Sequence, residues 1–231
     1  MKPRLFFIGE IGAARSAIAA ALAYSLIARN AEVQSAAIRP GAIDPLAMQV
    51  MAERGIDLQA IAVHQVTEVS AAGDYVFLLC REAAENANFL PPACERVVWE
   101  VPSPLPEAST QAERLTRLRT ICEELERRIT AWLAEHNLLS AEGVALRKVW
   151  HELARYEHPL FAWSAAAADN AVEISIRFRP PAEPVHDYLF QFQPREIASP
   201  QFPWLFQKQL YDCLHDYLVE MFVRNPQQDT E

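Results

Sequence analysis

One short stretch near the start of the sequence has the residue types of an anion site. Residues 5–8 are typical of an apolar strand, a glycine-bearing loop is expected over residues 9–14, and an alanine-rich helix begins close to Arg15 and Ser16. Where a strand of a parallel sheet passes into a helix through such a loop, the free N–H groups of the first helical turn and the helix dipole attract an anion. The predicted members of this site are Gly9, Gly12, Ala13, Ala14, Arg15 and Ser16.

A carboxylate in the same loop opposes this interpretation. Glu10 directly follows Gly9, and its negative charge repels a bound anion unless the side chain points outward. Arg15 then has a partner within the protein. The sequence leaves two alternatives open: Arg15 binds a phosphate-like anion, or the loop is a tight turn held by a Glu10–Arg15 ion pair.

The stretch resembles the signature loop of low-molecular-weight protein tyrosine phosphatases and of the related thiol-dependent arsenate reductases. In that pattern a cysteine ends the first strand, and an arginine followed by a serine lies six positions on. Arg15 and Ser16 match the pattern, but Gly9 stands in the place of the cysteine. These enzymes work through a covalent intermediate on a thiolate of low pKa, and glycine offers no nucleophile.

The resemblance covers residues 3–135 and continues beyond the loop. The further matches, in family order, are Ser35-Ala36-Ala37, Asp44-Pro45-Leu46-Ala47, Gly55-Ile56-Asp57, Asp74-Tyr75-Val76 and Trp99-Glu100-Val101-Pro102-Ser103-Pro104. The last segment resembles the one that carries the general acid, with Ser103 in place of the aspartate. Cys80 and the residues after it resemble the segment where arsenate reductases keep a second redox cysteine, and the third cysteine would fall at Ala87.

The chemical roles of the family are therefore lost one by one. A serine hydroxyl at Ser103 passes a proton to a leaving group poorly. Redox resolution needs two thiols within bonding reach, and only Cys80 remains of the expected set. We expect no catalytic residue, with degenerate positions at Gly9, Ala87 and Ser103. The leading hypothesis is a pseudoenzyme that acts by binding, as a regulatory, adaptor or assembly protein.

Two other functions stay open. An active phosphatase or arsenate reductase requires a displaced thiol, for which Cys80 is the cysteine expected near the loop. A sensor of phosphate or another oxyanion requires only Arg15 and the amides of the loop.

The composition is typical of a globular protein. The chain has 231 residues, of which 51% are hydrophobic, and a net charge of -9, which disfavours a nucleic-acid partner. The start of the chain lacks the features of a secretory signal, and no stretch is long and apolar enough to span a membrane. We therefore expect a cytoplasmic protein.

The cysteines and histidines match no cofactor or metal pattern. Cys80, Cys94, Cys122 and Cys213 are far apart and include no Cys-x-x-Cys pair, so free thiols are expected. The histidines of the second half of the chain have no zinc-site spacing. We predict no metal and no cofactor.

The first part of the chain alternates strands and helices. Strands are expected at residues 4–8, 32–37, 75–79 and 96–99, and helices at residues 13–29, 45–54 and 111–135. This alternation predicts an α/β fold, a four-stranded parallel sheet flanked by helices, and the resemblance implies the strand order 2-1-3-4. Ligands bind at the carboxyl ends of such strands, where residues 9–15, Cys80 and residues 99–104 should meet.

After a domain that we end at residue 138, residues 139–231 predict a separate, small α+β region. The expected order is helix, strand, strand, helix (αββα), at residues 144–156, 171–179, 186–193 and 203–224. A lone pair of strands needs support from the helices, from the first domain or from a second copy of the chain. The region is rich in aromatic residues, which either fill a core or form an interface with a protein partner or a second copy.

Overall fold

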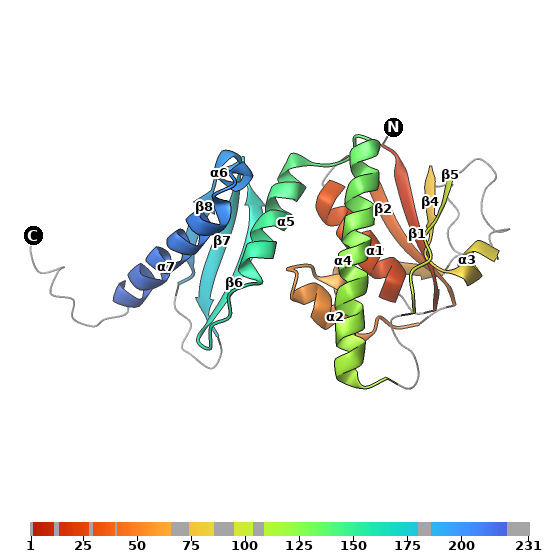
Figure 1. Ribbon diagram of the computed structural model, residues 1–231, viewed down its shortest axis with the longest axis horizontal. Helices are drawn as coiled ribbons and strands as arrows, with labels where there is room; N and C mark the ends of the chain where they lie inside the picture. Colours follow the sequence, from red (N-terminus) through yellow and green to blue (C-terminus); the bar gives the residue numbers. More distant parts are fainter. Residues whose placement is uncertain are drawn as a thin grey trace, which may run out of the picture. The chain divides into compact units, whose positions relative to one another are not determined.

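The computed structural model describes residues 2–11, 14–27, 30–39, 41–65, 74–85, 95–103, 109–179 and 186–220. The chain divides into two compact units, Met1–Gly143 and Val144–Glu231, each with its own hydrophobic core (Figure 1). This division lies a few residues after the predicted one at residues 138 and 139.

The N-terminal unit is built on a parallel sheet of five strands. The strands are β1 (Arg4–Ile11), β2 (Glu32–Arg39), β3 (Val63–Gln65), β4 (Tyr75–Leu78) and β5 (Glu95–Val98). Their order is β3-β2-β1-β4-β5, and every neighbouring pair is parallel. The predicted fold class and the order of the four predicted strands are confirmed. The prediction missed β3, because three residues are too few to show an alternating pattern.

Helices cover both faces of this sheet. They are α1 (Ala14–Ile27), α2 (Pro45–Ala52), α3 (Arg81–Glu85) and α4 (Gln111–Glu135), with a 3-10 turn at Leu58–Ala60. α1, α2 and α4 share a core with Leu5 and Phe7 of β1, whereas Phe6 and Ile8 face the opposite side and pack with Cys80 and α3. In the part of the chain that is described, no helix is long and apolar enough to cross a membrane.

The longest helix, α4, is fixed at its start and along its side. Thr110 and Glu113 form a capping box, in which each side chain accepts a hydrogen bond from the backbone N–H of the other. Three ion pairs join α4 to α2 and its flanking residues: Arg114–Asp44 (2.8 Å), Arg119–Glu53 (2.8 Å) and Arg54–Glu126 (2.6 Å). These contacts hold α4 beside the sheet.

The C-terminal unit is an antiparallel sheet of three strands packed against helices. The strands are β6 (Phe161–Ala168), β7 (Ala171–Phe178) and β8 (Tyr188–Phe192). The helices are α5 (Ala141–Leu153), whose first three residues belong to the N-terminal unit, α6 (Pro194–Ala198) and α7 (Phe202–Glu220). The predicted α+β region is confirmed, but it has three strands rather than the two of αββα. The prediction missed β6 because its sequence, FAWSAAAA, is rich in alanine, which has little strand preference.

Most of the aromatic residues of this unit fill its core. The buried ones are Phe161, Phe190, Phe192, Phe202, Phe206 and Tyr217. They pack with the apolar face of β7, and both α5 and α7 lie on that face (Figure 1). Trp204 and Tyr211 of α7 are instead exposed. Most of these aromatic residues therefore belong to the core, and two of the exposed ones lie on α7.

A buried glycine allows the start of α5 to approach the end of α1. A Cβ atom on Gly143 would lie 2.5 Å from the carbonyl oxygen of Ser25 and 2.9 Å from that of Leu26. The backbone N–H of Ser140 donates to the same Leu26 oxygen at 2.9 Å. The two backbones are therefore too close for any side chain at position 143.

We predict that Gly143→Ala destabilises the N-terminal unit by about 1–3 kcal/mol, because the added methyl group must push two backbone segments apart. This cost opposes and exceeds the gain in helix propensity, which is about 1 kcal/mol. Denaturant unfolding of the full chain measures the change. Glu142→Ala, at an exposed position of the same helix, is the control and should stay within about 0.5 kcal/mol of wild type. A Gly143→Ala protein as stable as wild type would contradict the close approach.

Candidate functional site

The carboxyl ends of β1, β4 and β5 surround a hollow of about 350 Å³. Its lining comes from the end of β1, the start of α1, the start of α3 and the loop after β5. The lining residues are Glu10, Arg15, Cys80, Arg81, Glu82, Glu100, Val101, Pro102 and Ser103. The three segments that the sequence predicted to meet, residues 9–15, Cys80 and residues 99–104, thus contribute to one site.

Both ends of the Arg15 guanidinium are engaged by the protein. Its Nη1 donates a hydrogen bond to the carbonyl oxygen of Val101 at 2.8 Å, and its Nη2 lies 3.7 Å from Oε2 of Glu10. Glu10 also forms an ion pair with Arg39 at the end of β2. The Arg15 side chain is only 11% exposed. Of the two alternatives for Arg15, the structure contains the ion pair with Glu10.

The lining of the hollow carries more acidic than basic groups. Glu10, Glu82 and Glu100 contribute carboxylates, and Arg15 and Arg81 contribute guanidinium groups. Arg81 is exposed and donates through Nε to Glu85 at 2.7 Å. This balance disfavours a bound anion. Within the described ranges, no group of three or more His, Cys, Asp or Glu side chains is placed to hold a metal ion.

The strand before the site is longer than predicted. Gly9 and Glu10 belong to β1 and not to a loop, because pairing with β2 continues through Gly9↔Ala37 to Ile11↔Arg39. The Glu10–Arg39 ion pair strengthens this end of the sheet. Ala14, Arg15 and Ser16 form the first turn of α1, as predicted. Gly12 and Ala13 lie outside the described residues.

Gly9 leaves room for a side chain and is not required by its backbone angles. Its φ is not in the left-handed region, and a Cβ atom built on it would lie 3.4 Å from Oγ of Ser16. That hydroxyl is buried and has no hydrogen-bond partner in the described structure. A side chain at position 9 would therefore point toward an unsatisfied serine hydroxyl at the start of α1.

Comparison with known proteins identifies this arrangement. A family model described as low molecular weight phosphotyrosine protein phosphatase matches residues 4–143. The chain belongs to this family. The match ends at the residue that closes the N-terminal unit, so that unit is the phosphatase-family domain and the C-terminal unit lies outside the match.

The curated relatives of the phosphatase-family domain are arsenate reductases. The arsenate reductase of Bacillus licheniformis is 26% identical over 129 residues, which cover 55% of this chain and 93% of that protein. The arsenate reductase of Halalkalibacterium halodurans is 27% identical over 129 residues, with the same coverage of 55% and 93%. A solved arsenate reductase in an oxidized state matches with a TM-score of 0.50 at 22% identity, covering 58% of this chain and 98% of that one. This last match supports the fold alone.

Cys80 of the phosphatase-family domain is a buried thiol at the edge of the hollow. Burial raises its pKa, and the charge of Glu82 acts in the same direction. A hydrogen bond from the backbone of Ala83 and the charge of Arg15 oppose this rise without cancelling it. Because the thiolate is the reactive form of cysteine, this environment suits a structural thiol better than a nucleophile.

The structure places the remaining candidate residues and cysteines as follows. Ser103 lines the hollow and is exposed, and Ala87 and Cys94 lie outside the described residues. Cys122 and Cys213 are free and buried, and neither lines the hollow. Among the described cysteines, Cys80 is therefore the one at the site.

Several residues at the site were not predicted. Arg39 and Arg81 were given no role by the sequence, and Glu82 and Glu100 lie in predicted segments of the site without having been named as site residues. Arg39 had a detectable signal, because strand pairing places it opposite Ile11, one residue beyond Glu10. The meeting of these segments was predicted, but the fold shows which of their charged side chains line the hollow.

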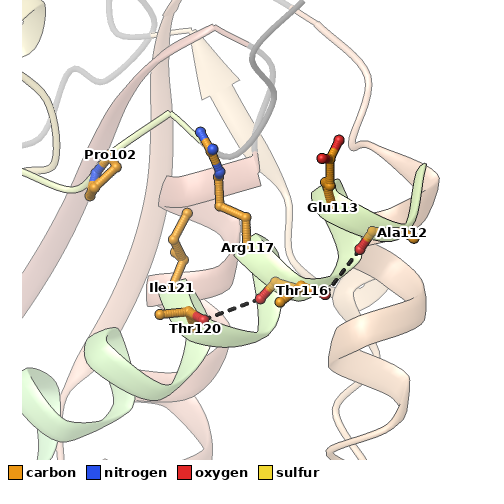
Figure 2. A pocket seen from close by; sticks show the side chains of 7 residues that line it. All are labelled: Pro102, Ala112, Glu113, Thr116, Arg117, Thr120 and Ile121. Atoms are coloured by element: carbon orange, nitrogen blue, oxygen red, sulfur yellow. Dashed lines mark hydrogen bonds between the residues drawn. The ribbon is translucent and has the colours of Figure 1, made fainter. Parts of the chain in front are cut away.

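A second hollow, of about 650 Å³, lies along the first turns of α4 (Figure 2). Pro102 lines both hollows, and the other lining residues of the second are Ala112, Glu113, Thr116, Arg117, Thr120 and Ile121. The hydroxyls of Thr116 and Thr120 donate to the carbonyls of Ala112 and Thr116, as Figure 2 shows, at 3.0 and 3.2 Å. Because the helix itself uses these hydroxyls, the surface that they present is largely apolar.

We predict that Cys80 of the native protein is alkylated by iodoacetamide much more slowly at neutral pH than the same cysteine in the unfolded chain. The thiol of Cys80 has a pKa raised above its ordinary value of 9.0. Its labelling rate should therefore keep rising about tenfold per pH unit beyond pH 9.0. Mass spectrometry of the Cys80 peptide after timed labelling gives both rates, with the unfolded chain as the internal control. Rapid labelling of native Cys80 at neutral pH would contradict the assignment.

Proposed function

We propose that the phosphatase-family domain is catalytically inactive and acts by binding, as a regulatory, adaptor or assembly protein of the cytoplasm. The observation that carries the proposal is Gly9, which stands at the end of β1 where the family has its cysteine nucleophile. Without a thiolate at this position the covalent step of the family has no attacking atom. A binding protein needs the scaffold and not that atom.

The state of Arg15 supports the same proposal. In a phosphatase the guanidinium has to be available to the oxygens of the phosphoryl group. Here one terminal nitrogen bonds the Val101 carbonyl at 2.8 Å and the other lies against Glu10. An anion at Arg15 would have to compete with the nearby Glu10 carboxylate for the positive charge of the guanidinium. The same cost counts against a sensor for phosphate or another oxyanion.

The environment of Cys80 counts against a displaced nucleophile. A replacement thiol has to be accessible and largely ionised near neutral pH. Cys80 is buried, and its burial raises the pKa of the thiol. The general acid is absent as well, because Ser103 occupies its position. Both halves of an acid–nucleophile mechanism are therefore unsupported.

We predict that the wild-type chain hydrolyses an aryl phosphate such as p-nitrophenyl phosphate no faster than buffer alone. The matched variants are Gly9→Cys/Ser103→Asp, which restores a nucleophile and an acid at the family positions, and Gly9→Ser/Ser103→Asp. The structure leaves room for the new side chain next to Ser16. We expect measurable turnover from the cysteine variant and none from the serine variant, because only a thiolate forms readily at this site.

The activity of the wild-type protein decides whether the proposal holds. Turnover by the wild type that Arg15→Ala abolishes would overturn the proposal, because such activity would belong to this site. Turnover that survives Arg15→Ala would indicate a contaminating phosphatase, and repurification would then remove it.

A further inference from the structure

The strand β6 lies at one edge of the sheet of the C-terminal unit, because the strand order is β6-β7-β8 (Figure 1). Its 8 residues, Phe161–Ala168, pair with β7 in one uninterrupted antiparallel register. Just before the strand, the carbonyl of Leu160 accepts a hydrogen bond from the backbone N–H of Arg179 at 2.8 Å. Because bonded and non-bonded pairs alternate along an antiparallel ladder, the even-numbered residues of β6 bond to β7. The N–H and C=O groups of its odd-numbered residues therefore point away from the sheet.

The outward backbone groups of β6 are largely unpaired. They belong to Phe161, Trp163, Ala165 and Ala167. The carbonyl of Phe161 accepts a hydrogen bond from Nε of Arg179 at 2.7 Å. For the outward groups of Trp163, Ala165 and Ala167, the described part of the chain provides no hydrogen-bond partner. Such a row of donors and acceptors is a template for a further β-strand.

β6 also lacks the usual protection of an edge strand. Proteins protect exposed edges by keeping the strand short, or with charged residues or a proline. β3, β5 and β8 have 3, 4 and 5 residues, and β5 carries Glu95 and Arg96. β6 has 8 residues and contains no charged residue and no proline. Among the sheet edges of the described residues, β6 is therefore the long one that is open to pairing.

The order of large and small side chains along β6 favours a second copy of the same strand. The large residues lie at its start and the alanines at its end. In an antiparallel pair with Ser164 opposite Ser164, the start of each copy meets the end of the other, and each large side chain lies beside an alanine. These pairs, with the second residue taken from the second copy, are Leu160–Ala168, Phe161–Ala167 and Trp163–Ala165. Leu160, which is 56% exposed, would then be covered.

The charges of β7 fit the same arrangement. Arg177 pairs with Ala162 and Glu173 with Ala166, on the face of the sheet opposite its core. Since Ala162 lies opposite Ala166 of the second copy, Arg177 of one copy and Glu173 of the other end the same row. Three strand spacings, about 14 Å, separate their backbones, and the alanines leave space for both long side chains to extend toward each other. Arg177 has no ion pair with another described residue, whereas Glu173 accepts one hydrogen bond from Gln191.

We propose that β6 pairs antiparallel with β6 of a second copy of this chain, centred on Ser164, so that the two sheets become one continuous sheet. The outward backbone groups of Trp163 and Ala165 bond to those of Ala165 and Trp163 of the other copy. The interface is self-complementary, as a two-fold axis requires. The inference does not rest on the proposed function, because β6 belongs to the C-terminal unit and not to the phosphatase-family domain.

Sedimentation equilibrium of the full chain at micromolar concentrations tests whether β6 holds a dimer. We expect a wild-type dimer, and we expect Ala165→Pro or Ala167→Pro to raise its dissociation constant at least about tenfold, because proline removes an N–H from the edge. β7 does not use that N–H, so each copy keeps its own sheet. The matched control is Leu189→Pro, at an outward position of β8, and it should leave the dimer unchanged. Circular dichroism confirms that each variant is folded.

Cysteine cross-linking tests the register without a proline. In the proposed pairing the two copies of Ser164 form a non-bonded pair with Cα atoms about 4.5 Å apart, a distance that a disulfide bridges. We expect Ser164→Cys to give a disulfide-linked dimer when oxidised glutathione is added, with the bond mapped by mass spectrometry to position 164 of both chains. The matched control is Ser175→Cys, next to Ser164 on β7, whose two copies would be about 14 Å apart. It should not cross-link.

Three results would overturn the proposal. The first is a monomeric wild type, including the case in which β6 pairs with a strand of a different protein. The second is a dimer that both proline variants leave intact. The third is a dimer in which Ser164→Cys cross-links no better than Ser175→Cys.

Discussion

The contacts of the Arg15 guanidinium connect the parts of the site to one another. Arg15 lies in the first turn of α1, its Nη1 bonds the backbone of the loop after β5, and its Nη2 lies 3.7 Å from Glu10 at the end of β1. Val101, which accepts the hydrogen bond, is itself joined to β4, because its N–H donates to the carbonyl of Leu79. One side chain thus links the first helix to three neighbouring strands at their carboxyl ends. The protein itself thus supplies a hydrogen bond and a counter-charge to this arginine.

The contact between Glu10 and Arg15 is also connected with the glycine at position 9. In the proposed binding protein no phosphoryl group forms at position 9, so a carboxylate beside it hinders no reaction, and Glu10 lies where it can neutralise the buried charge of Arg15. The Glu10–Arg39 ion pair joins β1 to β2 beyond Gly9, where the pairing of the two strands continues to Ile11↔Arg39. The buried hydroxyl of Ser16 has no hydrogen-bond partner among the described residues. Gly9, Glu10 and Arg15 are best understood together, as a scaffold whose charges are balanced internally.

The sequence predicted the elements whose patterns are long and local. The helix Gln111–Glu135 has a sustained apolar stripe and a capping box, and its bounds agree with the prediction. The strand at Ala171–Phe178 alternates apolar and polar residues from Val172 onward, and Val172, Ile174 and Ile176 are buried. β3 and β6 were missed for opposite reasons, since β3 is too short to show a period and β6 is made largely of alanine. Both are strands because a neighbouring strand pairs with them, which a single-sequence pattern does not record.

The site was predictable in its location and less so in its electrostatics. Family order and sheet topology placed Arg15, Cys80 and the loop after β5 together, because all three follow strands of one parallel sheet. The partners of Arg15 were only half predictable, since Glu10 is a neighbour in sequence whereas the Val101 carbonyl is 86 residues away. The carboxylates of Glu82 and Glu100 become part of the site through the geometry of α3 and the loop.

The most direct test of the central claim is to trap the covalent intermediate that a phosphatase must form. The wild-type chain is mixed with excess aryl phosphate, quenched in acid, and weighed intact by mass spectrometry. Because position 9 has no nucleophile, we predict a mass equal to that of the untreated chain at every quench time. A species heavier by one phosphoryl group, mapped to Cys80 or to any other residue at the hollow, would contradict the account.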